Sequence, residues 1–395
     1  MEGPCEGIAT MTRHRRTVGV AALTLLLGAG CGGDAPKHPS EPSTCTASLA
    51  FAVAAAADVP ARSPFDTLFA AAGAEFGVPA ELLRAIGYVE TRWQMVAGRE
   101  EHDGMPAAHG VMALRGERLR DGARLARVSE DAVRRDARAN VRAAAALLRA
   151  YADAEGIARA DVDAWDAAVA RYGGIVHPEG RASYLRDVRA VRGGRRAEPA
   201  LRSAADPCTP PSDPPAPTTD QPGAVWRTSP NFNARMAGVG GTIHMVIIHS
   251  CEGGYAGCWS WLADPASQVS AHYVVREDGA EITQLVREAS RAWHIGAIYD
   301  STLNAGHDGR LHGVQSNHFT IGVEHAGYAS QTSWPEAQID ASARLVCDLT
   351  KRWQIPRDRL HVVAHGQLQP ANRTDPGQGW PWADYLARID RYCAT

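Results

Sequence analysis

Lysine is almost absent from this 395-residue chain: Lys37 and Lys351 are the only two among 41 basic residues, and the others are arginines. Positive charges at functional positions are therefore expected to be guanidinium groups, which do not deprotonate in proteins. A large charge of either sign is also lacking, and a formal net charge of −3 gives no reason to expect a nucleic-acid partner. The 45% hydrophobic content is ordinary for a globular protein, and the length allows two or three domains.

Long apolar runs are lacking as well. The run Val18–Leu27 is shorter than the about 20 residues that a stable membrane span needs, and no other segment is long and apolar enough. It follows the basic run Met11–Arg16, where Met11 is an alternative start, so residues 1–31 read as an export signal. Small residues before Cys31 resemble a bacterial lipobox, although Gly28 stands where that motif prefers leucine. The resemblance implies a periplasmic lipoprotein acylated at Cys31, and Gly32, where the aspartate that often marks inner-membrane retention is lacking, favours the outer membrane. An ordinary signal and a secreted protein are the alternative.

Eight cysteines are present, and two of them lie in the leader. Six remain in an exported chain, and an even number in an oxidising compartment favours disulfides over buried free thiols, which are the alternative. The predicted pairs are Cys251 with Cys258, Cys347 with Cys393 and, by elimination, Cys45 with Cys208. Short spacing supports the first pair directly, and the second would join an expected helix to the C-terminus.

Composition divides the chain into segments. Residues 32–62 are rich in Pro, Ser, Ala and Gly and read as a tether, whereas residues 63–195 follow a helical pattern that predicts an all-α domain. Eight prolines within 196–222 predict a semi-rigid linker. Residues 223–395 hold ten of the fifteen histidines and eight of the ten tryptophans, so a different domain begins there.

This last segment alternates strand-like and helical patterns. Strand-like runs lie at 244–249, 272–276, 281–286, 319–325 and 361–365, and helical runs at 254–263, 335–354 and 381–392. The mixture predicts an α/β domain with a central mixed sheet flanked by helices.

Two apolar runs in this domain end in histidine, at His249 and at His365, and an Asp375-Pro-Gly turn follows ten residues after the second. The carboxyl ends of strands are where open-sheet enzymes place their sites. Taken singly, each histidine is more often a core or surface residue. Together, two imidazoles and a carboxylate suit a metal site with one open position, as in catalytic zinc centres.

Further motifs extend the pattern over roughly residues 225–393. They are Ile-Ile-His249-Ser, Val269-Ser-Ala-His-Tyr-Val-Val275, Asp278-Gly279, Ala292-Trp-His-Ile-Gly296, Ile321-Gly-Val-Glu324 and His365 to Gly377. In this order they resemble type 2 N-acetylmuramoyl-L-alanine amidases, whose fold is shared with peptidoglycan recognition proteins. The resemblance implies zinc as cofactor and peptidoglycan as substrate.

The resemblance also implies site residues. The zinc ligands would be His249, His365 and Asp375, and the acid/base carboxylate would be Glu324. The family often has lysine where Arg373 stands; arginine keeps the charge that stabilises an oxyanion but cannot act as a general acid.

Two more motif histidines and a tryptophan are candidates for substrate binding. His294 and its neighbour Trp293 are expected to contact substrate or line the cleft. His272 either contributes to the same site or is a packed histidine, and the sequence leaves both readings open.

The helical domain contains its own candidate. Glu90 falls on the apolar face of a helix predicted over 78–93, where partial desolvation and the negative helix end raise a carboxyl pKa. Val89-Glu-Thr91, Gly110–Leu114 and Ala170–Gly174 resemble lytic transglycosylases of the lysozyme-like superfamily. That family's serine after the glutamate, its glutamine at position 113 and its asparagine at position 173 are absent. A working catalyst with Glu90 as its acid and an inactive sugar-binding domain are both open.

The sequence thus predicts a monomeric cell-wall hydrolase that cuts the amide between N-acetylmuramic acid and L-alanine. A binding protein without turnover and a chain whose main activity is transglycosylation are the alternatives. Zinc content and products released from sacculi would distinguish them.

Overall fold

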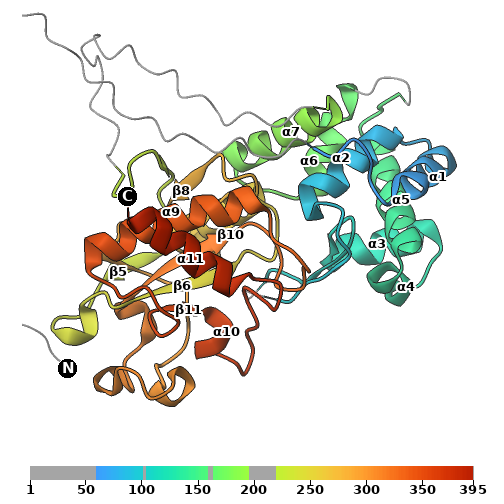
Figure 1. The fold of residues 1–395 in the computed structure, drawn as a ribbon. Coiled ribbons are helices and arrows are strands. Elements are labelled where there is room, and N and C mark those ends of the chain that lie inside the picture. Colours follow the sequence, from blue (N-terminus) through green and yellow to red (C-terminus); the bar gives the residue numbers. More distant parts are fainter. Residues whose placement is uncertain (1–58, 101–103, 159–162, 195–218, 395) are drawn as a thin grey trace, which may run out of the picture. The chain divides into compact units, whose positions relative to one another are not determined.

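The computed structural model describes residues 59–100, 104–158, 163–194 and 219–394 (Figure 1). The predicted export signal with Cys31, the pair Cys45 and Cys208, and most of the tether and linker lie outside these residues. Within the described part of the chain, no helix is both long enough and apolar enough to cross a bilayer.

Residues 59–194 are mainly helical, as predicted. The helices are α1 (Asp66–Phe76), α2 (Ala80–Thr91), α3 (Gly116–Ala126), α4 (Glu130–Arg135), α5 (Ala137–Ala154), α6 (Asp166–Gly173) and α7 (Pro178–Arg192). Helix α5 begins at a side-chain cap, because Asp136 accepts the backbone N–H of Ala139 at 2.7 Å. Both of its leucines and most of its alanines are buried, and α3, α1 and α6 pack around it.

The all-α prediction for this segment is wrong in one place, since a three-stranded sheet, β1 (Val96–Ala97), β2 (Ala108–Gly110) and β3 (Leu114–Arg115), interrupts the helices. Asn140 of α5 holds the turn after β2: its amide donates to the His109 carbonyl at 2.9 Å, and its Oδ1 accepts the Met112 N–H at 2.8 Å. Gly110 has φ 75°, and a Cβ there would lie 2.1 Å from the Asn140 amide nitrogen. Strands this short leave little periodic signal.

The C-terminal segment contains the predicted mixed sheet, whose strand order is β11-β6-β10-β7-β8-β4. The strands are β4 (Val225–Trp226), β6 (Met245–Ser250), β7 (Tyr273–Val275), β8 (Ile282–Gln284), β10 (Thr320–His325) and β11 (Val362–Ala364). The first four of the order are parallel, and β8 runs antiparallel to β7. A ribbon of β5 (Phe232–Ala234) and β9 (Ser290–Ala292) and the edge strand β4 were not predicted.

The two faces of the sheet differ in what covers them. Helices α9 (Glu336–Trp353) and α11 (Trp382–Cys393) lie side by side across one face (Figure 1), where Ile248 and Val323 belong to their buried cluster. Because side chains alternate along a strand, His249 and Glu324 point to the other face. The predicted helix 254–263 is observed as α8 (Tyr255–Leu262).

Two disulfides are present in the described residues, and they join the predicted partners. Cys251 and Cys258 link the end of β6 to α8, and Cys347 and Cys393 link α9 to α11, with Cα separations of 5.6 and 5.5 Å. These thiols are therefore not free.

The linker ends earlier than the predicted boundary at residue 222. Asp220 accepts a hydrogen bond from the Gln284 amide at 2.6 Å, and Gln221 donates to Asp348 at 2.7 Å. Residues 220 and 221 therefore pack with the sheet domain.

Candidate active site

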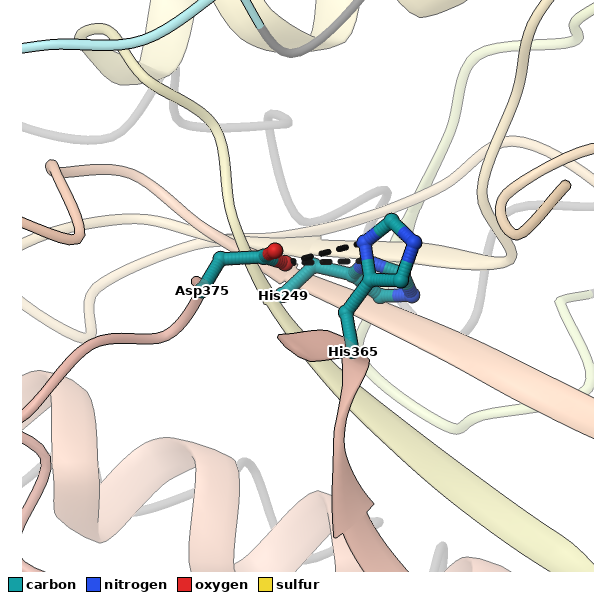
Figure 2. Close-up of side chains that lie close together, drawn as sticks. All are labelled: His249, His365 and Asp375. Carbon is teal, nitrogen blue, oxygen red and sulfur yellow. Dashed lines mark hydrogen bonds and ion pairs between the residues drawn. The ribbon is translucent and has the colours of Figure 1, made fainter. Parts of the chain in front are cut away.

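Three side chains from separate elements meet at the carboxyl edge of the sheet. His249 is the fifth residue of β6, His365 begins the short helix α10 (His365–Leu368) directly after β11, and Asp375 lies in the following loop. Nδ1 of His249 is 3.0 Å from Nδ1 of His365, and Asp375 Oδ2 is 3.3 and 3.1 Å from these two nitrogens. Figure 2 shows the carboxylate directed at both rings. All three residues are buried.

The other ring nitrogens of the two histidines are already occupied. His365 Nε2 lies 3.2 Å from Oε1 of Gln369, and His249 Nε2 lies 2.9 Å from Nδ1 of His294. Since the Gln369 oxygen only accepts, Nε2 of His365 carries the hydrogen and its Nδ1 presents a lone pair to Asp375. Asp375 Oδ1 is buried and has no hydrogen-bond partner within the described chain.

Electrostatics favour a neutral imidazole at His249. Burial, followed by the charge of His365, lowers the pKa of His249 to about 4. Burial alone would raise the pKa of Asp375, but the neighbouring rings of His365 and His249 hold it well below its usual value. At neutral pH His249 is therefore an uncharged imidazole, and Asp375 is a carboxylate.

This donor set fits a divalent cation. Ligand atoms at the about 2.0–2.2 Å bond lengths of tetrahedral zinc lie roughly 3.3 Å apart, close to the three observed distances of 3.0–3.3 Å. A cation would also satisfy atoms that otherwise face one another as acceptors. The residues predicted as ligands are thus brought together in the arrangement that such a site needs.

Glu324 and Arg373 both lie near this cluster. Oε1 of Glu324 is 4.0 Å from His249 Nδ1, and the side chain is almost completely buried. Arg373 is half-buried, and its positive charge contributes to the lowered pKa of His249. A buried carboxylate and a guanidinium beside two bare imidazoles are suited to proton transfer and to stabilisation of an oxyanion.

The three predicted substrate-binding residues lie in different environments. Trp293 is half-exposed, so its predicted contact with substrate remains open. His272 is fully buried and accepts the Gly322 N–H at Nδ1, which agrees with the packed reading. His294 is also buried behind His249, and its ring nitrogens face His249 and Thr320. Burial, with the charge of His249 second, holds the pKa of His294 well below its usual value.

The sequence reasoning missed Gln369 and Thr320. Gln369 lies four residues after His365, the spacing at which side chains meet on a helix, so this signal was readable. Thr320 belongs to the same strand face as Glu324, but its contact with His294 joins positions 26 residues apart and has no local signature.

Glu90 lies in α2 and is partly buried. The Tyr184 hydroxyl of α7 donates to its carboxylate at 2.7 Å. Burial raises the pKa of Glu90, and the hydrogen bond from Tyr184 opposes part of that effect. Gly173 makes room for this tyrosine, because a Cβ there would lie 2.7 Å from the Tyr184 ring.

Comparison with known proteins places the site in a family. Residues 239–378 match the N-acetylmuramoyl-L-alanine amidase family. The N-acetylmuramoyl-L-alanine amidase A of Achromobacter lyticus is 34% identical over 185 residues, which are 42% of this chain and 93% of that protein. The 1,6-anhydro-N-acetylmuramyl-L-alanine amidase AmpD of Citrobacter freundii is 32% identical over 122 residues, 31% of this chain and 58% of AmpD.

The mixed sheet and its buried cluster therefore define an amidase. This chain belongs to the N-acetylmuramoyl-L-alanine amidase family. Among solved structures, a selenomethionine derivative of AmpD aligns with 43% of this chain and 96% of its own, at 26% identity and a TM-score of 0.36. The complex of AmiD from E. coli with anhydro-N-acetylmuramic acid-L-Ala-D-γ-Glu-L-Lys aligns with 39% of this chain and 61% of its own, at 26% identity and a TM-score of 0.32.

Proposed function

We propose that the protein is a zinc-dependent amidase that hydrolyses the amide between the lactyl group of N-acetylmuramic acid and the L-alanine of the peptidoglycan stem peptide. The substrate is supported by the activity that the Achromobacter relative is named for. Zinc is supported by one observation above all: three buried donor atoms lie 3.0–3.3 Å apart with their lone pairs facing one another. His249, His365 and Asp375 would hold the ion and leave one position open.

Zinc at this position would polarise the scissile carbonyl and lower the pKa of a water molecule to about 7. Glu324 accepts the proton of the attacking water and delivers it to the leaving nitrogen of L-alanine as the C–N bond breaks. Its burial beside His249 keeps the carboxylate directed at the reacting atoms. Arg373 offsets the negative charge that develops on the carbonyl oxygen.

The test is digestion of purified sacculi with mass spectrometry of the products, combined with zinc analysis of the purified protein. The wild type should release stem peptides with a free L-alanine amine and contain about one zinc ion per chain. His365→Ala should lose both. His361→Ala is the matched control, because His361 lies on the same run but pairs with Asp358 at 2.7 Å instead. Full activity of metal-free protein would overturn the zinc proposal.

A second candidate function belongs to the helical segment: it binds the glycan strand or cleaves it as a lytic transglycosylase. The supporting observation is the carboxyl group of Glu90, which accepts a hydrogen bond from Tyr184 and whose pKa is raised by burial, since a raised carboxyl pKa favours an acid catalyst. In the same digests, Glu90→Gln should abolish anhydromuramyl ends, while the surface variant Glu75→Gln should not. Unchanged products from Glu90→Gln would leave glycan binding as the role of this segment.

We also propose that the protein is exported and carries a lipid at Cys31 that attaches it to the outer membrane. The two disulfides support an oxidising compartment. Cys31→Ser should move the protein from the membrane fraction to the soluble periplasm and prevent labelling by a fatty acid. A wild type that is itself soluble and unlabelled would favour an ordinary secretory signal.

A further inference from the structure

The ring of His294 connects the predicted metal ligand His249 to a hydroxyl group deeper in the sheet domain. His249 Nε2 is 2.9 Å from His294 Nδ1, and His294 Nε2 is 3.0 Å from Thr320 Oγ1. We infer that His294 is a positioning residue that holds His249 in the tautomer and orientation required for metal binding, and that Thr320 sets the tautomer of His294. This inference rests on the proposed zinc site.

In the series His249–His294–Thr320, the direction of each hydrogen bond follows from the Thr320 hydroxyl group. The Thr320 hydroxyl donates its hydrogen to the Ser316 carbonyl at 2.9 Å, so its oxygen accepts from His294 Nε2–H. A neutral imidazole with a hydrogen on Nε2 has a bare Nδ1, which accepts from His249 Nε2–H. Nδ1 of His249 is then bare as well, and it faces His365 and Asp375. The two contacts together thus leave the lone pair of His249 Nδ1 at the metal position.

The surrounding chain holds His294 in this position. Its backbone N–H and that of Ile295 both donate to Asn317 Oδ1, at 3.1 and 2.9 Å. Gly322 of β10 provides the space for the ring, because a Cβ there would lie 2.4 Å from His294 Cγ. A glycine inside a strand often marks a close approach of this kind.

Such an arrangement has a measurable consequence for metal affinity. Groups that hydrogen-bond to a ligating histidine commonly change metal affinity by tenfold to a hundredfold when they are removed. His294 is 5% exposed, so it is poorly placed for the substrate contact that its motif position suggested. A positioning role predicts weaker zinc binding, whereas a substrate role predicts a higher KM at unchanged zinc affinity.

The experiment measures the zinc dissociation constant of the full chain by competition with a chromophoric chelator. His294→Leu should weaken zinc binding by about 10- to 100-fold, whereas His294→Asn, whose amide oxygen can replace Nδ1 as acceptor, should stay within about threefold. Thr320→Val and Thr320→Ser form a second matched pair, in which only the valine should weaken binding. Melting of the metal-free proteins and the visible spectra of the cobalt forms show whether each variant is folded and how it holds the ion.

The possible results separate the proposed zinc site from the positioning role of His294. If wild-type protein bound no zinc, the proposed function itself would fail. If it bound zinc and His294→Leu bound equally tightly, only the positioning role would fail. Equal losses in His294→Leu and His294→Asn would also overturn it, since ring packing rather than the acceptor would then matter. Should both His294 variants fail to fold, equal zinc affinity of the two Thr320 variants would overturn the tautomer assignment.

Discussion

Glu324 and His249 are register partners across the parallel strands β10 and β6, and Glu324 Oε1 lies 4.0 Å from His249 Nδ1. The proposed acid/base carboxylate and one of the proposed metal ligands are therefore positioned by the same ladder of backbone hydrogen bonds. Both sit in strands that are buried along their whole length. Rigid elements hold catalytic groups more accurately than loops do.

Replacing this carboxylate should separate catalysis from metal binding. Glu324→Gln is expected to lower kcat on muropeptides by about 10²- to 10⁴-fold, the range typical of general acid–base groups. Zinc content should remain near that of the wild type, because Glu324 is not one of the three proposed ligands. Steady-state kinetics and metal analysis of the same preparation measure both, and a fully active variant would contradict the assigned role.

Arg373 offers a test of charge against proton transfer. Arg373→Met should reduce kcat by about 10²- to 10³-fold, comparable to losing one oxyanion donor. Arg373→Lys should retain most of the activity, because the positive charge remains. The alkaline side of the wild-type pH–rate profile should not depend on this residue, since arginine does not deprotonate. A lysine variant as inactive as the methionine variant would show that more than charge is needed.

The two disulfides should affect different properties. Loop-closure entropy gives about 2 kcal/mol for a separation near seven residues and about 4 kcal/mol for one near 46, so removing Cys347–Cys393 should lower stability more. Cys251–Cys258 lies beside Glu324, with ligand-type atoms of all three within 4.8 Å. Its removal should therefore lower kcat more than its effect on unfolding would suggest. Double alanine variants, compared by denaturant unfolding and kinetics, distinguish the two effects.

Replacing Glu90 and replacing Glu75 with glutamine should change the melting temperature at pH 7 in opposite directions. Burial raises the pKa of Glu90 above the usual 4.5, so the ionised form destabilises the fold at neutral pH. Glu90→Gln should then raise the melting temperature at pH 7, and the gain should disappear as the pH falls below the usual carboxyl range.

Hydrogen bonds from Arg142 lower the pKa of Glu75. The ion pair of Glu75 with Arg142 therefore stabilises the fold at pH values above the usual carboxyl pKa, and this stabilisation is lost as the pH falls. Glu75→Gln should thus lower the melting temperature slightly at pH 7. Thermal melts at several pH values check both signs. A Glu90→Gln variant less stable than the wild type at pH 7 would contradict the effect attributed to burial.

The sequence predicted the parts of the fold that carry strong periodicity. The apolar runs ending at His249 and Glu324 are continuous enough to identify buried strands, and both are observed at the expected residues. The ribbon of β5 and β9 consists of three-residue strands, too short for a period to be recognised. The small sheet around Gly110 depends on Asn140, 30 residues away, and tertiary contacts of this kind leave no local pattern.

The ligand set could be predicted because its residues stand at recognisable positions in the sequence. The role of His294 could not, because it depends on tertiary packing. His249, His365 and Asp375 follow strand ends and a turn, where residue type and position together indicate a ligand. The role of His294 depends on which atom of each ring faces which neighbour, and that orientation follows only from the packing of β10 against the loop after β9. Neighbouring Trp293 and His294 consequently differ in exposure although they share one motif.

The contacts at both ends of the sheet domain bear on how a smaller enzyme can be prepared. The match to the amidase family spans residues 239–378, yet α11 and Cys393 cover one face of the sheet beyond that point, and Asp220 and Gln221 form hydrogen bonds with the sheet domain well before residue 239. A fragment cut at the limits of that match would expose apolar surface and be prone to aggregate. Expression of an isolated amidase should therefore begin before Asp220 and continue through Cys393.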